Sequence, residues 1–269
     1  MTRSKWDQRI QRAAGLAETY PFAAEVLRLY KSCATFQRSL YERLEADVGQ
    51  QLSDLTSPPS APGFDLLLPA LPDFFSTIAR IAPEPVEIAA RKLASQDSAH
   101  WRDLLGSCWS AAPDFQPAPT NIEAALAWVF LQPYAELLAA RRKPTQHSET
   151  LAVCPFCSAR PVVGVLRPEG EGGKRSLICS FCATEWTFGR IRCAACGEEA
   201  VEKLAVYAAE QFEHIRVEAC DGCRHFIKTV DLTRNGRAVP QVDELAALPL
   251  DLWALEHGYI KLQPNFLGI

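Results

Sequence analysis

Four closely spaced pairs of cysteines in the second half of the chain constrain its fold more than any other feature. Two residues separate the cysteines of each pair, and the pairs are Cys154/Cys157, Cys179/Cys182, Cys193/Cys196 and Cys220/Cys223. The tight turn of such a pair directs both sulfurs to one side, so two pairs can hold one metal ion tetrahedrally. Disulfides are the alternative in small secreted proteins, but this chain has 269 residues and no visible export signal. The pattern therefore predicts two metal ions, each bound by four cysteine thiolates.

The spacing between the pairs favours sites that close locally. Joining the first pair to the second encloses 21 residues, and joining the third to the fourth encloses 23. A cross-braced arrangement, first with third and second with fourth, needs interleaved chain. We favour the tandem arrangement because closing a short loop costs less entropy. Geometry leaves the metal open between zinc and rubredoxin-like iron, and a thioredoxin-type redox pair lacks the βαβ setting that it needs.

The first half of the chain has the periodicity of helices. Apolar residues recur at steps of three and four from Phe22 to Val48, which predicts one long helix with Pro21 in its first turn. A second long apolar helix is predicted over 121–142, bent or restarted near Pro133. Shorter helices are predicted near the N-terminus and over 73–81, 86–95 and 98–107. Together they predict a helical, bundle-like domain.

The character of the sequence changes near residue 146, where glycines and short β-leaning segments replace the helical pattern. Strands are predicted over 161–166, 176–178, 186–188, 200–207, 214–219 and 226–231, and a last helix over 242–256. We therefore predict an α+β protein with a helical N-terminal domain, two small rubredoxin-like or zinc-ribbon metal modules and a C-terminal helix. The predicted domains are 1–146 (helical), 147–190 (first metal ribbon), 191–232 (second metal ribbon) and 233–269 (C-terminal helix and tail).

Charge and the remaining polar residues exclude several function classes. The formal net charge is −4, and ten basic residues balance ten acidic ones between Cys154 and Lys228. Four thiolates around a divalent ion add further negative charge, so the region lacks the basic surface that nucleic acid requires. The five histidines form no recognisable ligand or triad spacing, and a four-sulfur site has no open position for hydrolysis. These observations predict a binding protein, not an enzyme.

No segment of the sequence predicts export or membrane insertion. Residues 1–15 have the pattern of a charged amphipathic helix, unlike a secretory signal. The most apolar stretch, 124–140, is short for a bilayer and is interrupted by Gln132, Pro133 and Glu136. We therefore expect a cytoplasmic protein.

Several segments carry a resemblance to a known family. They are Cys154-Pro155-Phe156-Cys157, Cys179-Ser180-Phe181-Cys182-Ala183-Thr184-Glu185-Trp186, Cys193-Ala194-Ala195-Cys196-Gly197, Leu131-Gln132-Pro133-Tyr134-Ala135-Glu136 and Lys228-Thr229-Val230-Asp231. On these residues the chain resembles the formate dehydrogenase accessory protein family, FdhE, over nearly its whole length.

The resemblance implies a cytoplasmic accessory protein that binds the catalytic subunit of respiratory formate dehydrogenase and is needed for its maturation. It implies that the eight paired cysteines are the metal ligands, with iron in rubredoxin-like sites or zinc in their place. It makes Thr184, Glu185, Trp186 and Arg190 candidates for a partner-binding or site-supporting surface. Two other classes stay open, a rubredoxin-like electron-transfer protein and a general zinc-ribbon interaction module, as does formation of a homodimer.

Overall fold

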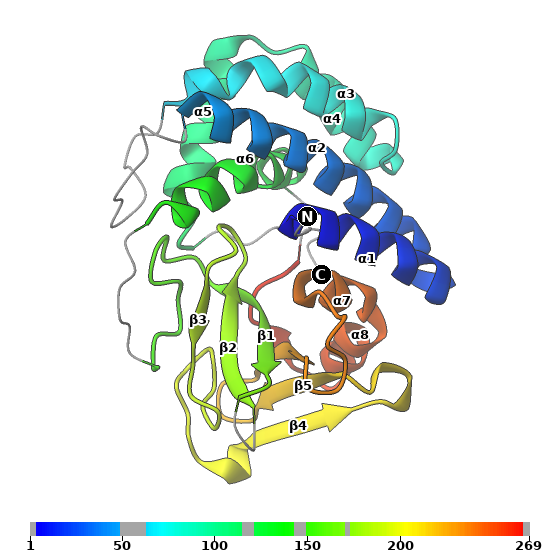
Figure 1. The fold of residues 1–269 in the computed structure, drawn as a ribbon, viewed down its shortest axis with the longest axis vertical. Helices are drawn as coiled ribbons and strands as arrows, with labels where there is room; N and C mark the ends of the chain where they lie inside the picture. The colour runs from blue at the N-terminus through cyan, green and yellow to red at the C-terminus, as the bar shows by residue number, and fades with distance from the viewer. Residues whose placement is uncertain (1–3, 49–62, 115–120, 143–148, 170–172, 266–269) are drawn as a thin grey trace.

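The computed structural model describes residues 4–48, 63–114, 121–142, 149–169 and 173–265, and its helical layer lies against a curled β-sheet (Figure 1). Both ends of the described chain lie near the junction of helices and sheet. The helices of this layer are α1 (Lys5–Thr19), α2 (Ala24–Val48), α3 (Leu71–Ala79), α4 (Glu84–Ala94), α5 (Ser98–Ser110) and α6 (Ile122–Ala140). The predicted helical N-terminal half is confirmed, while the boundary predicted at residue 146 lies outside the described residues.

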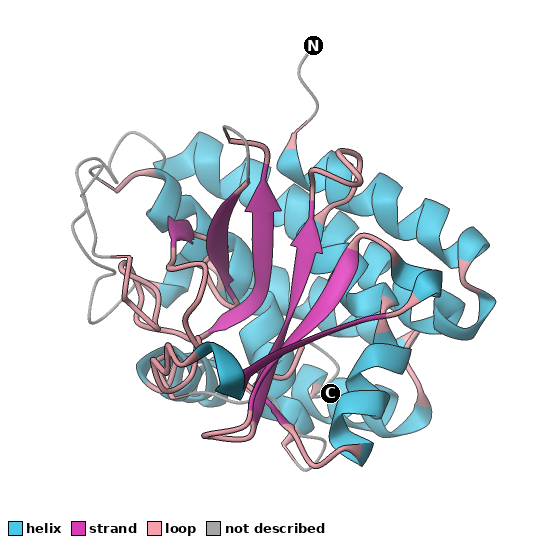
Figure 2. Ribbon diagram, turned by 90° about the horizontal axis from the view of Figure 1, so that it is seen from below, coloured by secondary structure: helices cyan, strands magenta, loops and turns pink. Residues whose placement is uncertain are grey.

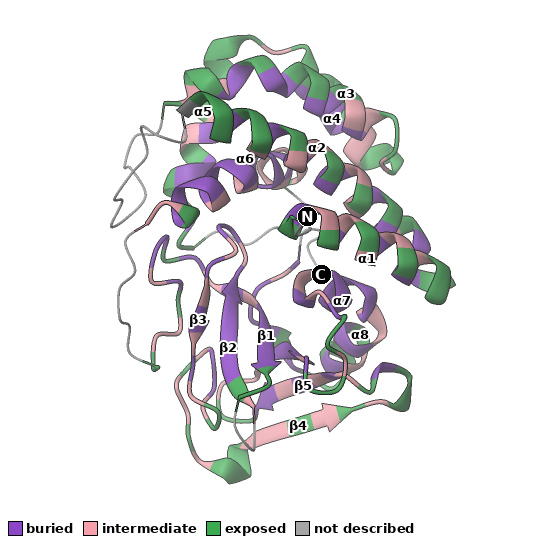
Figure 3. Cartoon of the chain, viewed as in Figure 1, coloured by how far each residue is buried: buried purple, intermediate pink, exposed green. Residues whose placement is uncertain are grey.

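Helix α6 is the centre of this layer. It is apolar on nearly every side, and Trp128, Phe130 and Leu131 are all fully buried, as expected for a helix surrounded by protein. Figure 3 shows the contrast with α2 and α5, whose outer faces are exposed. Two predictions near prolines need correction. Pro21 begins a separate 3-10 turn ahead of α2, and α6 continues through Pro133 as one helix without restarting.

A buried glutamine compensates for Pro133. Proline has no N–H, so it cannot donate to the carbonyl of Val129 four residues earlier. The side chain of Gln37 in α2 donates to that carbonyl at 2.6 Å instead, and also to Oε1 of Gln132 at 2.9 Å. Gln132 in turn donates to the carbonyl of Ser180, inside the second cysteine pair, at 3.0 Å. This chain of hydrogen bonds connects α2 to α6, and α6 to the cysteine-rich region.

The cysteine-rich half forms one seven-stranded sheet with the order β3-β2-β1-β6-β5-β4, and β7 pairs with β6. The strands are β1 (Pro161–Arg167), β2 (Lys174–Cys179), β3 (Glu185–Thr187), β4 (Leu204–Ala208), β5 (Ile215–Cys220), β6 (His225–Asp231) and β7 (Ile260–Lys261). Two antiparallel units, β1–β3 and β4–β6, correspond to the two predicted ribbons. The parallel pairing of β1 with β6 joins them, and Figure 2 shows helices packed behind the sheet.

Gly164 allows strands β1 and β6 to pair. Gly164 lies opposite Thr229 in the β1–β6 register. A Cβ atom at this position would collide with the Thr229 side chain. The close approach of the two strands therefore requires a residue without a side chain.

The predicted C-terminal helix is two helices, α7 (Pro240–Ala246) and α8 (Leu248–Glu256). The prediction of one helix over 242–256 was wrong because Pro249 lies in the first turn of a new helix. Lys228 of β6 is completely buried and donates to the carbonyl of Ala247, at the break, at 3.2 Å. It also pairs with Asp251 of α8 at 2.5 Å. The carbonyl of Ala247 thus accepts both from the N–H of Leu250 in α8 and from Lys228 of the sheet. Together with the ion pair to Asp251, this contact holds both helices on the sheet.

Candidate metal centres

The first cluster brings together the first and second cysteine pairs. Cys154 and Cys157 lie in the loop before β1, while Cys179 ends β2 and Cys182 follows in the turn to β3. The sulfur of Cys157 lies 3.4 Å from that of Cys179 and 3.5 Å from that of Cys182. The sulfurs of Cys154 and Cys182 are 3.6 Å apart. All four side chains are buried.

The second cluster brings together the third and fourth pairs. Cys193 and Cys196 lie in the loop after β3, and Cys220 and Cys223 flank the tight turn between β5 and β6. The sulfurs of Cys193 and Cys223 are 3.7 Å apart, and those of Cys196 and Cys220 are 3.8 Å apart. In contrast to the first cluster, Cys196 is exposed and Cys223 is half-buried. The arrangement is the tandem one.

These separations fit a tetrahedral metal ion. A metal–sulfur bond of about 2.3 Å places two sulfurs of a tetrahedron about 3.8 Å apart. Within each cluster all four sulfurs lie within 4.8 Å of one another. Backbone N–H groups inside the knuckles also point at sulfur, since the N–H of Phe156, Phe181 and Ala195 donate to Cys154, Cys179 and Cys193 at 3.3 to 3.4 Å. Both sets of four cysteines could therefore hold a metal ion.

All four knuckles share one backbone conformation. The residue that follows the second cysteine of each pair has a positive φ, with 61° at Ser158, 52° at Ala183, 79° at Gly197 and 60° at Arg224. Only one of these residues is glycine, and the left-handed conformation costs other residues about 1–2 kcal/mol. The same backbone strain occurs in all four cysteine pairs, because this turn directs both sulfurs of a pair toward one point.

Burial and mutual hydrogen bonds shift the pKa values of the thiols in the first cluster in opposite directions. Hydrogen bonds from the neighbouring cysteines, Cys157 first, lower the pKa of the Cys154 thiol. Burial raises the pKa of the Cys179 and Cys182 thiols well above the ordinary value. Ionisation of all four sulfurs in this buried space would therefore need a positive ion between them.

Two of the four other predicted site residues pack beside the first cluster. Thr184 is buried, and its Oγ1 lies 3.1 Å from the sulfur of Cys182. Trp186 is buried in the same core and donates from its indole N–H to the carbonyl of Leu151 at 2.9 Å. Thr184 and Trp186 are therefore placed where they can support the first cluster.

The other two lie nearer the surface. Glu185 of β3 forms a two-point ion pair with Arg167 of β1, on the far side of β2, at 2.6 and 2.7 Å. Arg190 is exposed and lines a groove beside the second cluster. Neither side chain is brought to the sulfurs of the first cluster by a hydrogen bond that the structure describes.

Sequence reasoning missed the residues that connect the first cluster to the helices. Phe181, between the two cysteines of its knuckle, lies against Trp128 of α6 with ring centroids 4.2 Å apart, and against Trp109 of α5 at 5.5 Å. Gln132 makes the hydrogen bond to Ser180 described above. Gln132 and Pro133 inside the apolar stretch 124–140 are the available signal. The sequence marks them as interruptions and as part of a family resemblance, but it does not predict their contact with the cluster. The first cluster is thus part of the helical core.

Two protein-family models match this chain, and the boundary between them separates the two cysteine clusters. The model of the FdhE central domain matches residues 153–190, and that of the FdhE C-terminal domain matches residues 191–267. One cysteine cluster falls in each match. The chain belongs to the FdhE family. Among the helices that the structure describes, none is both long and apolar enough to cross a membrane.

Relatives in this family align over nearly the whole chain or over about half of it. An FdhE homolog from Pseudomonas aeruginosa is 28% identical over 99% of this chain and 90% of its own length. An FdhE homolog from Aquifex aeolicus is 34% identical, but over 52% of this chain and 50% of its own length. The crystal structure of the FdhE protein from Pseudomonas aeruginosa has a TM-score of 0.72, with 24% identity, 99% of this chain covered and 97% of that one. This last match shows that the two share a fold.

Proposed function

We propose that this FdhE family protein is a cytoplasmic accessory protein that binds the catalytic subunit of respiratory formate dehydrogenase and is needed for its maturation. The observation that carries the proposal is the match of both FdhE domain models across residues 153–267, which contain all eight paired cysteines. Each model contributes one complete set of four ligands. The proposed role therefore depends on two intact metal sites.

The protein would act by binding, without catalysis of its own. Two metal ions, either iron in rubredoxin-type sites or zinc, would occupy the clusters. Four sulfurs fill the coordination of either ion and leave no open position for a substrate or water. This closed ligand set supports a non-enzymatic role.

The difference in burial supports a division of labour between the clusters. The first is buried in the helical core beside Phe181 and α6, so its metal would hold the helical layer to the sheet. The second has the exposed Cys196 and would be the one that a client protein can reach. The first site would then secure the fold, and the second would face the partner.

A rubredoxin-like electron carrier is the second candidate, and the exposure of Cys196 favours it. Electron transfer requires a metal close to the surface. Iron with a reversible reduction potential would support this function. A protein that is active with zinc alone would exclude it, because zinc has no accessible second oxidation state.

An anaerobic affinity pull-down tests the proposed function. The tagged, metal-loaded protein is incubated with the formate dehydrogenase catalytic subunit beside a Cys179→Ser/Cys182→Ser variant. The matched control is Cys33→Ala/Cys108→Ala, which removes the two buried cysteines outside the clusters. We expect capture by the native protein and the control, and none by the cluster variant. Capture no better than that of the tag alone, by folded and metal-loaded native protein, would overturn the proposal.

A further inference from the structure

A long side chain, Arg224, stands where the backbone of the second cluster favours glycine. Arg224 follows the fourth cysteine pair, Cys220/Cys223, with a φ of 60°. The residues in the same place after the other three pairs are serine, alanine and glycine, and glycine adopts this left-handed conformation without steric cost. The arginine side chain does not help the turn itself, so its value must lie in what the guanidinium contacts.

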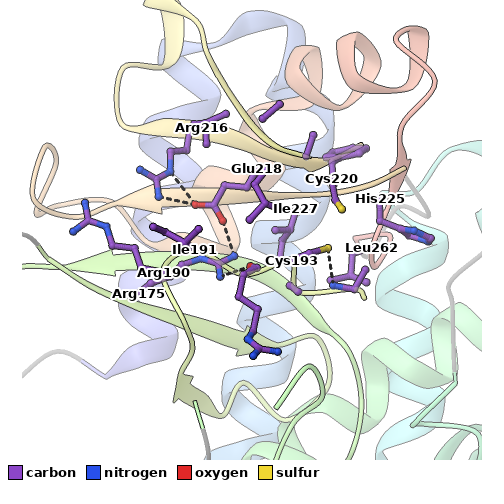
Figure 4. Close-up of a pocket in the computed structure, with 18 of the residues that line it drawn as sticks. Arg175, Arg190, Ile191, Cys193, Arg216, Glu218, Cys220, His225, Ile227 and Leu262 are labelled. Carbon is purple, nitrogen blue, oxygen red and sulfur yellow. Dashed lines mark hydrogen bonds and ion pairs between the residues drawn. The ribbon is translucent and has the colours of Figure 1, made fainter. Parts of the chain in front are cut away.

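Arg224 lies between the fourth cysteine pair and strand β6. Its N–H donates to the carbonyl of Cys220 at 2.8 Å, which closes the turn around the pair. Figure 4 shows Cys193 and Cys220 of the second cluster lining one cavity together with His225, where β6 begins. The carbonyl of Arg224 accepts from the N–H of Ile260 at 2.7 Å. A movement of Arg224 would therefore move the backbone that carries two ligands of the second ion.

The guanidinium of Arg224 reaches the end of helix α8. It donates to the carbonyl of His257 at 2.6 Å and, in a longer contact, to that of Gly258 at 3.4 Å. Helix α8 ends at Glu256, and the last carbonyls of a helix lack N–H partners from the helix itself. A cation at this end is also favoured by the helix dipole. Arg224 therefore caps the C-terminus of α8.

The same helix end is closed by its own backbone. The N–H of Gly258 donates to the carbonyl of Leu255 at 2.9 Å, and the N–H of Tyr259 donates to that of Ala254 at 3.0 Å. This is the Schellman arrangement, in which glycine takes a positive φ, and φ is 75° at Gly258. A Cβ atom at position 258 would lie 3.3 Å from Nη2 of Arg224. The guanidinium therefore packs directly on the turn that ends α8.

Asp221 and Tyr259 complete the connection. Asp221 lies between Cys220 and Cys223, and its Oδ1 accepts from Arg224 at 3.0 Å and from the hydroxyl of Tyr259 at 2.7 Å. The guanidinium carbon of Arg224 lies 4.0 Å from the centre of the Tyr259 ring, which is a cation–π distance. One carboxylate, one guanidinium and one phenol thus join the cysteine pair to the end of α8.

We propose that Arg224 is a positioning residue for the second metal site, which it serves by anchoring the fourth cysteine pair to the C-terminal end of α8. An ion bound at this pair would then stabilise the last turn of α8. An ordered last turn would in return stabilise the bound ion, because coupling between two sites is reciprocal. The first cluster is supported by α6 and the helical core, and the second would be supported by α8. This role of Arg224 does not depend on which protein the chain binds.

Chelator-driven alkylation tests the proposal in the full-length protein loaded with zinc. EDTA removes the ions in the presence of iodoacetamide, and peptide mass spectrometry follows the modification of the cysteines of each cluster separately. The test variant is Arg224→Ala, which gives the fourth pair the residue type that follows the second pair and removes only the side-chain contacts. The matched control is Ser158→Ala, in the same place after the first pair, where Ser158 is exposed and φ is 61°.

We expect Arg224→Ala to speed the alkylation of Cys220 and Cys223 about three- to tenfold, as for loss of partly exposed contacts of a charged group. Ser158→Ala should leave alkylation of the first cluster within about twofold of the native rate. Arg224→Lys, whose ammonium can still donate to one carbonyl, should give an intermediate rate. A native rate in Arg224→Ala, an equal acceleration of the first cluster by Ser158→Ala, or no rescue by lysine would overturn the proposal.

Amide hydrogen exchange at the end of α8 tests the reciprocal effect. Exchange of the N–H groups of His257 and Gly258, which donate to carbonyls of α8, is compared between the zinc-loaded native protein and Cys196→Ser/Cys223→Ser. The amides of α4 serve as the reference for global folding. We expect exchange at least about threefold faster in the cysteine variant, and a change of less than about twofold when the same substitutions are made in the Arg224→Ala background. Equal acceleration in both backgrounds would show that Arg224 does not carry the coupling.

Discussion

Removal of the Gln37 side chain tests the connection between Pro133 and the cysteine-rich half. In the native protein Gln37 donates to the carbonyl of Val129, which Pro133 leaves without a helix donor, and to the side chain of Gln132. A Gln37→Ala substitution removes both hydrogen bonds at a buried position. The carbonyl of Val129 would then have no protein donor from α2 or from the helix.

The cost follows from those two lost bonds. A buried acceptor left without a donor costs about 1–3 kcal/mol, and a typical buried hydrogen bond contributes about 1 kcal/mol. We therefore expect Gln37→Ala to lower the free energy of unfolding by about 2–4 kcal/mol. The exposed Gln11→Ala in α1 is the matched control, with an expected change within about 0.5 kcal/mol.

A double-mutant cycle with Pro133→Ala isolates the proposed cause. Alanine at position 133 restores an N–H that can donate to the carbonyl of Val129. We expect Gln37→Ala to cost about 1–2 kcal/mol less in the Pro133→Ala background. Urea denaturation of the metal-loaded proteins, followed by circular dichroism with equal m-values across the four variants, gives the four free energies. Costs that agree within about 0.5 kcal/mol in both backgrounds would refute the reasoning.

Three further predictions follow from the cysteine clusters and the ion pairs. A chelator should remove metal in two phases, with the cluster that contains the exposed Cys196 losing its ion first; a colorimetric metal assay that shows a single phase for both ions would contradict this. Ala183→Gly should raise the free energy of unfolding by about 0.5–1 kcal/mol, because φ is 52° there; denaturant midpoints check it, and a lower midpoint would be the contrary result. Burial raises the pKa of Asp243, but hydrogen bonds from His214 and Arg12 outweigh burial, so that its pKa lies below the ordinary 3.8. Its stabilising contribution is then complete above about pH 5 and is lost as pH falls through 3.8 toward the lowered pKa. Asp243→Asn should flatten the acid limb of the stability profile, and an unchanged slope would count against the account.

Local patterns predicted much of this fold because helices and knuckles are local structures. The three- and four-residue periodicity before residue 140 reports directly on the buried face of each helix. The two-residue spacing within cysteine pairs reports on a turn that spans only a few residues. The tandem arrangement was also predictable, since it closes the shorter loops.

Nonlocal features could not be predicted in the same way. The parallel pairing of β1 with β6 joins segments more than sixty residues apart, as Gly164 opposite Thr229 illustrates, and no single-segment pattern encodes it. The hydrogen bond that Lys228 donates to the carbonyl of Ala247 likewise joins residues of distant elements. The unequal burial of the clusters likewise depends on α6, which packs on Phe181 and has no counterpart at the second cluster in the described core.

Metal content tests most directly the central claim of two tandem four-cysteine sites. Protein purified anaerobically is analysed by inductively coupled plasma mass spectrometry beside two double variants. Cys157→Ser/Cys182→Ser changes two ligands of one cluster, and Cys157→Ser/Cys196→Ser changes one ligand of each. The account predicts two ions per chain in the native protein, one in the first variant, and weakened binding at both sites in the second. Loss of both ions from the first variant with retention of one in the second, or fewer than two ions in the native protein, would contradict it.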